Sequence, residues 1–316
     1  MRPLCAAARR LAGAAILAAA AVTVAPPAFG AAPREKEAAL LAKLRQRIDA
    51  VDARLDGVLG VYAEDLSTGA KLEMRADEAF PTASSIKLAV LYELYRQAQD
   101  GRVTLREATR PPAARVRGGG VLQELGDSVS LTWRDLAVLM IGWSDNEATN
   151  VLVRRVGMDA VNARLDGLGL PGTRLRRLMM DVDAARRGEE NVSTPREIAR
   201  LAAIVGRGEG LSPDAARDIL AVASVADDGS SFRRGLPEGV RAVSKPGALE
   251  GVRCEAAWVD VPGRPYAAAI MTAYLKRESD GDAAIAEISA ALYDTFDRLA
   301  RSSDLGRIIS ERDSAR

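Results

Sequence analysis

Residues 80–87 read Phe80-Pro81-Thr82-Ala83-Ser84-Ser85-Ile86-Lys87, which is typical of a helix start carrying a serine and a lysine three positions apart. Side chains at that spacing share one helix face, so the Ser84 hydroxyl and the Lys87 amine come within reach of each other. Free backbone N–H groups at a helix start also favour negative charge near Ser84. A neutral Lys87 can then accept the Ser84 proton and make Ser84 a nucleophile. By itself, Ser-x-x-Lys also arises by chance, with serine as a cap and lysine as a solvated residue.

The composition of the 316-residue chain supports lysine as the base. The chain contains no histidine, which excludes a Ser-His-Asp triad, a Cys-His dyad and any histidine-ligated metal. Its two cysteines, Cys5 and Cys254, are too few for a cysteine-rich zinc site, so we expect no metal and no cofactor. Of the 44 lysine and arginine residues only six are lysine, and Lys87 and Lys245 both lie in candidate motifs. Arginine keeps its proton in proteins, whereas a buried lysine can lose it.

Charge and the N-terminal segment bear on partners and location. A net charge of +1 leaves no basic surplus for nucleic acid. Three arginines (Arg2, Arg9 and Arg10) precede an apolar run over about 11–25, so residues 1–31 are predicted to be a cleaved signal peptide. The alternative, a membrane anchor, would need roughly 20 apolar residues. We therefore predict an exported protein, periplasmic or extracellular, that is monomeric and has no membrane anchor after cleavage.

The order of the predicted elements indicates an α+β fold. Strand-like segments come near the two ends of the mature chain (58–65, 71–76, 240–244, 255–261 and 266–274). Helical segments flank them and fill the middle (35–55, 83–100, 132–140, 146–156, 159–165, a helix capped by Thr194, 213–223 and 282–301). Segregated strands and helices predict one antiparallel sheet flanked by N- and C-terminal helices, with an inserted all-helical subdomain. The predicted parts are an α/β subdomain (33–82 and 226–301), a helical subdomain (83–225) and a polar tail (302–316).

Two more polar clusters lie where these parts would meet. Ser144-Asp145-Asn146 precedes the helix 146–156, and Lys245-Pro246-Gly247-Ala248 follows the strand 240–244. Each also fits a local interpretation, because Ser, Asp and Asn are preferred helix caps and Pro-Gly ends strands. Residues 171–191 show no periodicity and are predicted to be a long loop, which in compact domains is usually functional or disordered.

With the flanking Phe80-Pro81, Leu131-Thr132-Trp133-Arg134-Asp135-Leu136 and Thr194-Pro195, these clusters make residues 38–301 resemble the class A β-lactamases and their penicillin-recognising relatives. The resemblance implies a β-lactamase/DD-peptidase-like fold and a small-molecule β-lactam or acyl-peptide substrate. It makes Ser84 the acylated nucleophile, Lys87 its proton partner and Ser144 the proton relay. The implied substrate-binding residues are Asn146, Lys245, Gly247, Ala248 and Arg253, with the backbone N–H groups of Ser84 and Ala248 as the oxyanion hole. A surface role for Arg253 is the alternative.

The sequence departs from that family at two points. The family has a loop glutamate that activates water for deacylation; here its place falls on Met179 counted from Thr173, or on Leu178 counted back from Pro195. Neither can act as a base, and Asp181 or Asp183 would have to replace it. Pro246 also removes a hydroxyl and an N–H group where the family has Thr or Ser.

Three hypotheses follow from these losses. The first is a class A-type serine hydrolase that forms a Ser84 acyl-enzyme and hydrolyses it, with deacylation impaired by the missing glutamate. The second is a peptidoglycan D-alanyl peptidase or esterase, and the third is a penicillin-binding protein with reduced turnover. Losing a general base costs roughly 10²–10⁴-fold in rate, so the acyl-enzyme would be long-lived in each case where it forms.

Overall fold

The computed structural model describes residues 32–225, 229–303 and 305–308, and within them the α+β fold class is confirmed. A five-stranded antiparallel sheet has the order β2-β1-β9-β8-β7. Its strands are β1 (Val58–Asp65), β2 (Lys71–Met74), β7 (Ala242–Leu249), β8 (Val252–Val259) and β9 (Tyr266–Ala273). The N-terminal hairpin therefore joins the three C-terminal strands in one sheet, as expected. The predicted signal peptide lies outside the described residues.

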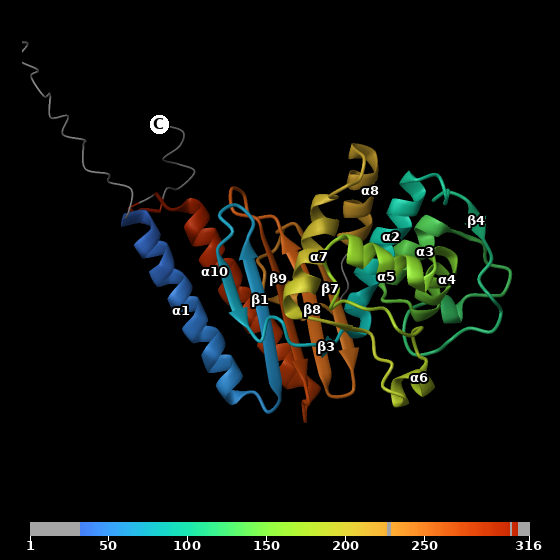
Figure 1. Cartoon of the computed structure of the whole chain (residues 1–316), viewed down its shortest axis with the longest axis horizontal. Coiled ribbons are helices and arrows are strands. Elements are labelled where there is room, and N and C mark those ends of the chain that lie inside the picture. The colour runs from blue at the N-terminus through green and yellow to red at the C-terminus, as the bar shows by residue number, and fades with distance from the viewer. Residues whose placement is uncertain (1–31, 226–228, 304, 309–316) are drawn as a thin grey trace, which may run out of the picture.

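Helices cover both faces of this sheet (Figure 1). On one face lie α1 (Ala32–Arg54) and α10 (Glu278–Arg301), which pack Ile48 and Leu292 into a core with Ile270 of the sheet. On the other face lies α7 (Pro195–Arg207), with most of the remaining helices beyond it. Burial from both sides explains why β9 is a continuous apolar run instead of an alternating one.

The second part of the molecule is built from helices and short strand pairs. Its elements are the 3₁₀ turns η1 (Ala83–Ile86) and η2 (Leu122–Glu124), the helices α2 (Lys87–Gln99), α3 (Trp133–Gly142), α4 (Asn146–Val156), α5 (Met158–Gly167), α6 (Val182–Arg186) and α8 (Pro213–Ala223), and the strand pairs β3 (Phe80–Pro81) with β6 (Val192–Ser193) and β4 (Ala108–Thr109) with β5 (Leu131–Thr132). The short helix α9 (Ser231–Arg234) packs against α10 instead. Thr194 caps α7 and Pro195 is its first residue, as predicted.

Three expectations need correction. The loop 171–191 is ordered and contains the short helix α6. The strand expected to end at residue 244 continues through the Lys245 cluster to Leu249, because β7 is an edge strand, where a proline without an N–H group is tolerated. The short helix α9 had no counterpart among the predicted elements, since four residues carry no periodicity.

The subdomain boundaries remain predictions. The helix α7 belongs by sequence to the predicted helical part, yet it packs against β8, β9 and β1. Most of the predicted polar tail lies outside the described residues; within them, Ser302 and Ile308 form an isolated bridge. Among the described helices, none combines the length and the apolar composition needed to cross a membrane.

Candidate active site

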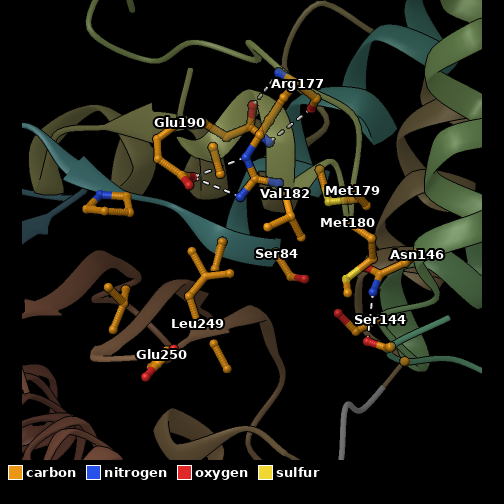
Figure 2. Close-up of a pocket in the computed structure, with 18 of the residues that line it drawn as sticks. Ser84, Ser144, Asn146, Arg177, Met179, Met180, Val182, Glu190, Leu249 and Glu250 are labelled. Atoms are coloured by element: carbon orange, nitrogen blue, oxygen red, sulfur yellow. Dashed lines mark hydrogen bonds and ion pairs between the residues drawn. The ribbon is translucent and has the colours of Figure 1, made fainter. Parts of the chain in front are cut away.

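A cavity of about 700 Å³ opens between the end of β7, the turn η1 and the loop 171–191. It brings together four of the predicted site residues: Ser84, Ser144, Asn146 and Ala248. Figure 2 shows Ser84 near the middle of this space, with Leu249 on one side and Ser144 on the other. The three polar clusters of the sequence therefore meet at one place, although they are separated by up to 160 residues along the chain.

Ser84 and Lys87 are held by a tight turn instead of a regular α-helix. The segment begins as the 3₁₀ turn Ala83–Ile86, in which side chains three positions apart stack directly, and becomes α-helical at Lys87. Ser84 is partly exposed to the cavity, whereas Lys87 is fully buried. Ala83 has a φ of 45°, a left-handed conformation that costs energy for a residue with a Cβ. The backbone just before the nucleophile is thus strained.

The Lys87 amine contacts the second cluster directly. Its Nζ donates to the Ser144 carbonyl at 2.6 Å, to Ser144 Oγ at 3.1 Å and to Asn146 Oδ1 at 3.0 Å. A hydroxyl can both accept and donate, so Ser144 Oγ can pass a proton between the lysine and a group bound in the cavity.

In the cluster Ser144-Asp145-Asn146, the middle residue stabilises a helix end and its two neighbours line the cavity. Asp145 caps α4 by accepting from Ala148 N at 2.8 Å and also accepts from Leu122 N at 2.7 Å. Asn146 Nδ2 donates to the Gly118 carbonyl at 2.9 Å, so both ends of its amide are engaged. At Gly120, a Cβ would lie 2.2 Å from Asp145 Oδ2, which explains a glycine there. The capping interpretation holds for Asp145, while its two neighbours face the cavity.

The third cluster packs against the turn that carries Ser84. Lys245 is fully buried, its Nζ donates to the Pro246 carbonyl at 3.2 Å, and its own carbonyl accepts from Ser85 Oγ at 2.9 Å. A Cβ on Gly247 would lie 2.4 Å from the Thr82 carbonyl oxygen, so glycine lets β7 approach the turn before Ser84. Gly247 is described but does not line the cavity; the next residue, Ala248, does.

Arg253 does not reach the cavity. Its guanidinium pairs with Asp282 at 3.3 Å and Glu278 at 3.8 Å, and it donates to the Val252 carbonyl at 2.8 Å. Its Cβ lies 3.0 Å from where a Cβ of Gly281 in α10 would be, on the sheet face that α10 covers. The structure therefore favours the alternative role, a surface arginine, over binding of a substrate carboxylate.

The loop 171–191 forms one wall of the cavity and is closed at its base. Arg174 N donates to the Val192 carbonyl at 2.8 Å, and Val192 N donates back to the Arg174 carbonyl at 3.1 Å. The Arg177 guanidinium lies 2.9 Å from Glu190, and both side chains line the cavity (Figure 2). Arg177 and Glu190 were not among the predicted site residues; opposite charges near the two ends of a long loop are the signal in the sequence that points to such a pair.

Asn150 of α4 fixes the register of the loop. Its Oδ1 accepts from Met179 N at 2.8 Å, and its Nδ2 donates to the Met179 carbonyl at 3.1 Å. Met179 and Met180 line the cavity, and Met179 is also a buried member of the hydrophobic core, against which the partly buried Leu178 packs. Of the two places considered for the missing glutamate, Met179 is the one that faces the cavity.

The two candidate deacylation bases point elsewhere. Asp181 caps α6 by accepting from Ala184 N at 2.9 Å. Asp183 is exposed and pairs with Arg186 at 3.0 Å. Both aspartates belong to the described residues, and neither lines the cavity. The loop therefore presents methionine side chains to Ser84 where an acid–base group was expected.

Comparisons with known proteins identify the family of the chain. The model of the beta-lactamase enzyme family matches residues 43–296. A beta-lactamase from Streptomyces cellulosae is 31% identical over 264 residues, which is 81% of this chain and 83% of that protein.

Solved structures give the same fold. An ancestral class A beta-lactamase superposes with a TM-score of 0.74 at 26% identity, covering 80% of this chain and 100% of that one. PBP-A superposes with a TM-score of 0.74 at 30% identity over 81% of this chain and 96% of that one. A leucine-to-glutamate mutant of PBP-A has been solved as an acyl-enzyme complex with penicillin G, and it matches 81% of this chain and 97% of its own at 30% identity and a TM-score of 0.73. A family model that matches most of the chain, together with relatives of this identity and coverage, shows that the chain belongs to the beta-lactamase enzyme family as a relative of the class A serine enzymes.

Proposed function

We propose that this protein is a serine hydrolase in which β-lactams acylate Ser84, and from which the acyl group leaves slowly. The observation that carries the proposal is the contact of the buried Lys87 amine with Ser144 Oγ and Asn146 Oδ1, beside the cavity that Ser84 lines. That arrangement supplies a base, a proton relay and an amide group around one hydroxyl. Because the chain contains no histidine, a lysine in this arrangement takes the place of the usual base that activates a serine.

Acylation follows from these groups. Neutral Lys87 accepts the Ser84 proton as Oγ bonds to the lactam carbonyl carbon, and the backbone N–H groups of Ser84 and Ala248 stabilise the negative oxygen. The C–N bond of the ring then breaks. Ser144 donates its hydroxyl proton to the leaving nitrogen and recovers a proton from Lys87. Lys245, buried in β7, adds positive potential near the same groups.

Deacylation lacks an equivalent group. Hydrolysis needs a base for the attacking water, and the loop wall of the cavity carries Met179, Met180 and Val182. Of the carboxylates along the cavity, Glu190 is paired with Arg177, and Glu250 lies across from Met179 (Figure 2). A missing general base slows a step by roughly 10²–10⁴-fold, so the acyl-enzyme accumulates.

Intact-mass spectrometry with penicillin tests this proposal. The wild type should gain the mass of one penicillin and keep it while little product accumulates. Ser84→Ala should gain none. The control Ser128→Ala removes an exposed serine hydroxyl that does not line the cavity, and it should behave like the wild type. A wild type that is never acylated would contradict the proposal, and so would an adduct that survives in Ser84→Ala.

A second candidate is acyl transfer from D-alanyl peptides or simple esters. It is favoured by the methionine wall, because an acyl-enzyme protected from water lives long enough to be intercepted by another nucleophile. Product formation from a D-alanyl peptide at a rate above that from penicillin would establish this candidate. If the adduct forms with penicillin and no peptide or ester is turned over, the protein is a penicillin-binding protein with reduced turnover.

Export and the monomeric state are further proposals. N-terminal sequencing of the mature protein from the periplasm or the medium should find a start close to residue 32. Sedimentation should give the mass of one chain.

A further inference from the structure

A second groove lies beside the active-site cavity. Its volume is about 640 Å³, and it shares Pro81, Glu250 and Val252 with the cavity that Ser84 lines. The two hollows therefore adjoin each other along these three residues. A compact acyl group bound at Ser84 would occupy the first hollow and leave the second empty, so the groove points to substrates with a longer acyl chain.

The floor of the groove is apolar. Val58 at the start of β1 faces Ala273 at the end of β9, and Phe80 is buried next to them. These side chains belong to the edge of the sheet core and present carbon atoms to the groove. An extended aliphatic chain is the kind of group that such a floor accommodates, because its methylene groups leave water on binding.

The rim of the groove is acidic and aromatic. Glu78 and Glu250 are both exposed and line it, and Tyr274 is 85% exposed with a φ of 58°. Over the described part of the chain, neither carboxylate has an ion-pair partner and no lysine or arginine lines the groove.

The nearby basic side chains have partners of their own. Arg75 pairs with Asp52 at 3.0 Å, and Lys276 pairs with Asp56 at 2.8 Å. The groove therefore carries negative potential from two carboxylates and the electron-rich face of one ring. An ammonium group is attracted to both, whereas a carboxylate is repelled.

We propose that this groove is an acyl-chain subsite for an aliphatic chain that ends in an ammonium group, as in an amine-bearing peptide side chain. The inference rests on the proposed acyl-enzyme, since the chain enters the groove from the carbonyl bonded to Ser84. The apolar floor takes the methylene groups, and Glu78, Glu250 and Tyr274 surround the amine. The natural substrate class is then a peptide-like acyl donor with a cationic end.

Two synthetic acyl donors test the subsite. Both are esters with the same leaving group and the same chain length, and one ends in an ammonium group while the other ends in a neutral methyl group. The wild type should acylate about three- to tenfold faster (kcat/KM) with the ammonium donor at low salt, and the ratio should fall as salt screens the rim. The readout is the ratio within each protein, so a partly damaged variant remains informative.

Variants assign the effect to the rim. The double variant Glu78→Gln/Glu250→Gln should bring the ratio close to one, and Glu250→Lys should favour the neutral donor. Glu238→Gln is the matched control, because this exposed glutamate lies before the start of β7 whereas Glu250 follows its end. It removes the same charge and should keep the wild-type ratio.

The outcomes separate the subsite from the proposed function. Equal rates for the two donors in the wild type would overturn the subsite, and so would a ratio that falls as much in Glu238→Gln as in the double variant. Acylation by penicillin without reaction of either ester would also overturn the subsite and leave the acyl-enzyme intact. If neither penicillin nor an ester acylates Ser84, the proposed function fails.

Discussion

At the residue scale, Met179 lies on the cavity wall where the proposed hydrolysis would need a base. Its thioether cannot accept a proton, and its backbone is held on both sides by the Asn150 amide. A side chain substituted at this position would therefore point into the same cavity. The backbone that would hold a base at this position is therefore already fixed by Asn150, and the side chain of Met179 cannot act as that base.

Replacing Met179 with glutamate should restore hydrolysis. Met179→Glu is expected to shorten the lifetime of the penicillin adduct by roughly 10²–10⁴-fold, because a positioned carboxylate can take a proton from water. Adduct lifetime by intact mass and turnover of a chromogenic cephalosporin measure the change.

Two sets of controls show whether position matters. Val182→Glu adds the same charge to the cavity wall at another place and should have a much smaller effect. Asp181→Ala and Asp183→Ala should leave the lifetime unchanged, because these carboxylates do not line the cavity. Faster deacylation in Val182→Glu than in Met179→Glu, or slower deacylation in either alanine variant, would contradict this account.

Cys254 should be unreactive in the native protein. Burial raises the pKa of its thiol to about 12, so the reactive thiolate is scarce at neutral pH. Iodoacetamide at pH 8 should leave Cys254 unlabelled in peptide maps until denaturant is added. Because the folded protein holds this proton more tightly than the unfolded chain, the group's contribution to stability is complete below the ordinary thiol pKa and falls as pH rises toward 12. Rapid native labelling at pH 8 would refute the prediction.

At the element scale, hydrogen bonds hold the edge strand β7 against the turn η1. The Ser85 hydroxyl bonds to the Lys245 carbonyl, and the Cys254 thiol donates to the Thr82 carbonyl at 2.9 Å. These contacts hold the strand carrying Ala248 against the turn carrying Ser84. The proposed oxyanion hole therefore depends on the distance between two elements that are far apart in the sequence.

Gly247→Ala should separate these two elements. The added Cβ would lie 2.4 Å from the Thr82 carbonyl and 2.6 Å from Cys254 Sγ, so the strand must move. Overpacking of this kind costs about 1–3 kcal/mol of folding free energy, and we expect acylation by penicillin to slow by about tenfold or more. Thermal unfolding and the acylation rate at saturating penicillin measure the two effects.

Gly126→Ala is the matched control. No atom lies within 4 Å of a Cβ at that position, so stability and acylation should stay close to wild type. An acylation rate that Gly247→Ala leaves unchanged would show that the strand position does not set the oxyanion hole.

At the scale of the whole molecule, stability depends on the seam between the sheet and α7. Gly206 of α7 packs against Trp258 of β8, and a Cβ at Gly206 would lie 2.5 Å from the indole ring. Because α7 also contacts β9 and β1, this helix joins the sheet to the rest of the helices. A change at the seam should therefore affect the entire fold and not one loop.

Gly206→Ala is expected to lower the free energy of unfolding by about 1–3 kcal/mol, since neither the ring nor the helix backbone can retreat without opening the core. Denaturant unfolding gives the measurement. Gly167→Ala in α5 has nothing within 4 Å of the new Cβ and should be neutral or slightly stabilising, as alanine favours helix. Equal effects of the two substitutions would mean that the seam is not tightly packed.

The motifs alone led to the correct family and fold class. The Ser84 turn, the Ser144 cluster and the Lys245 cluster predicted a class A-related serine hydrolase, which the family match confirms. Helix ends were also predictable, as at Thr194, because capping depends on residues within a few positions of one another. Features that depend on residues close together along the chain, such as motifs and helix ends, could thus be predicted from the sequence.

Only the tertiary structure decided which side chains meet in the cavity. It placed Met179, and not Leu178, on the wall of the cavity that Ser84 lines, and it held Arg253 against α10. It also opened a second groove between β1, β9 and the turn after β7. These outcomes depend on packing between elements distant in the sequence, which no local pattern of capping or periodicity encodes.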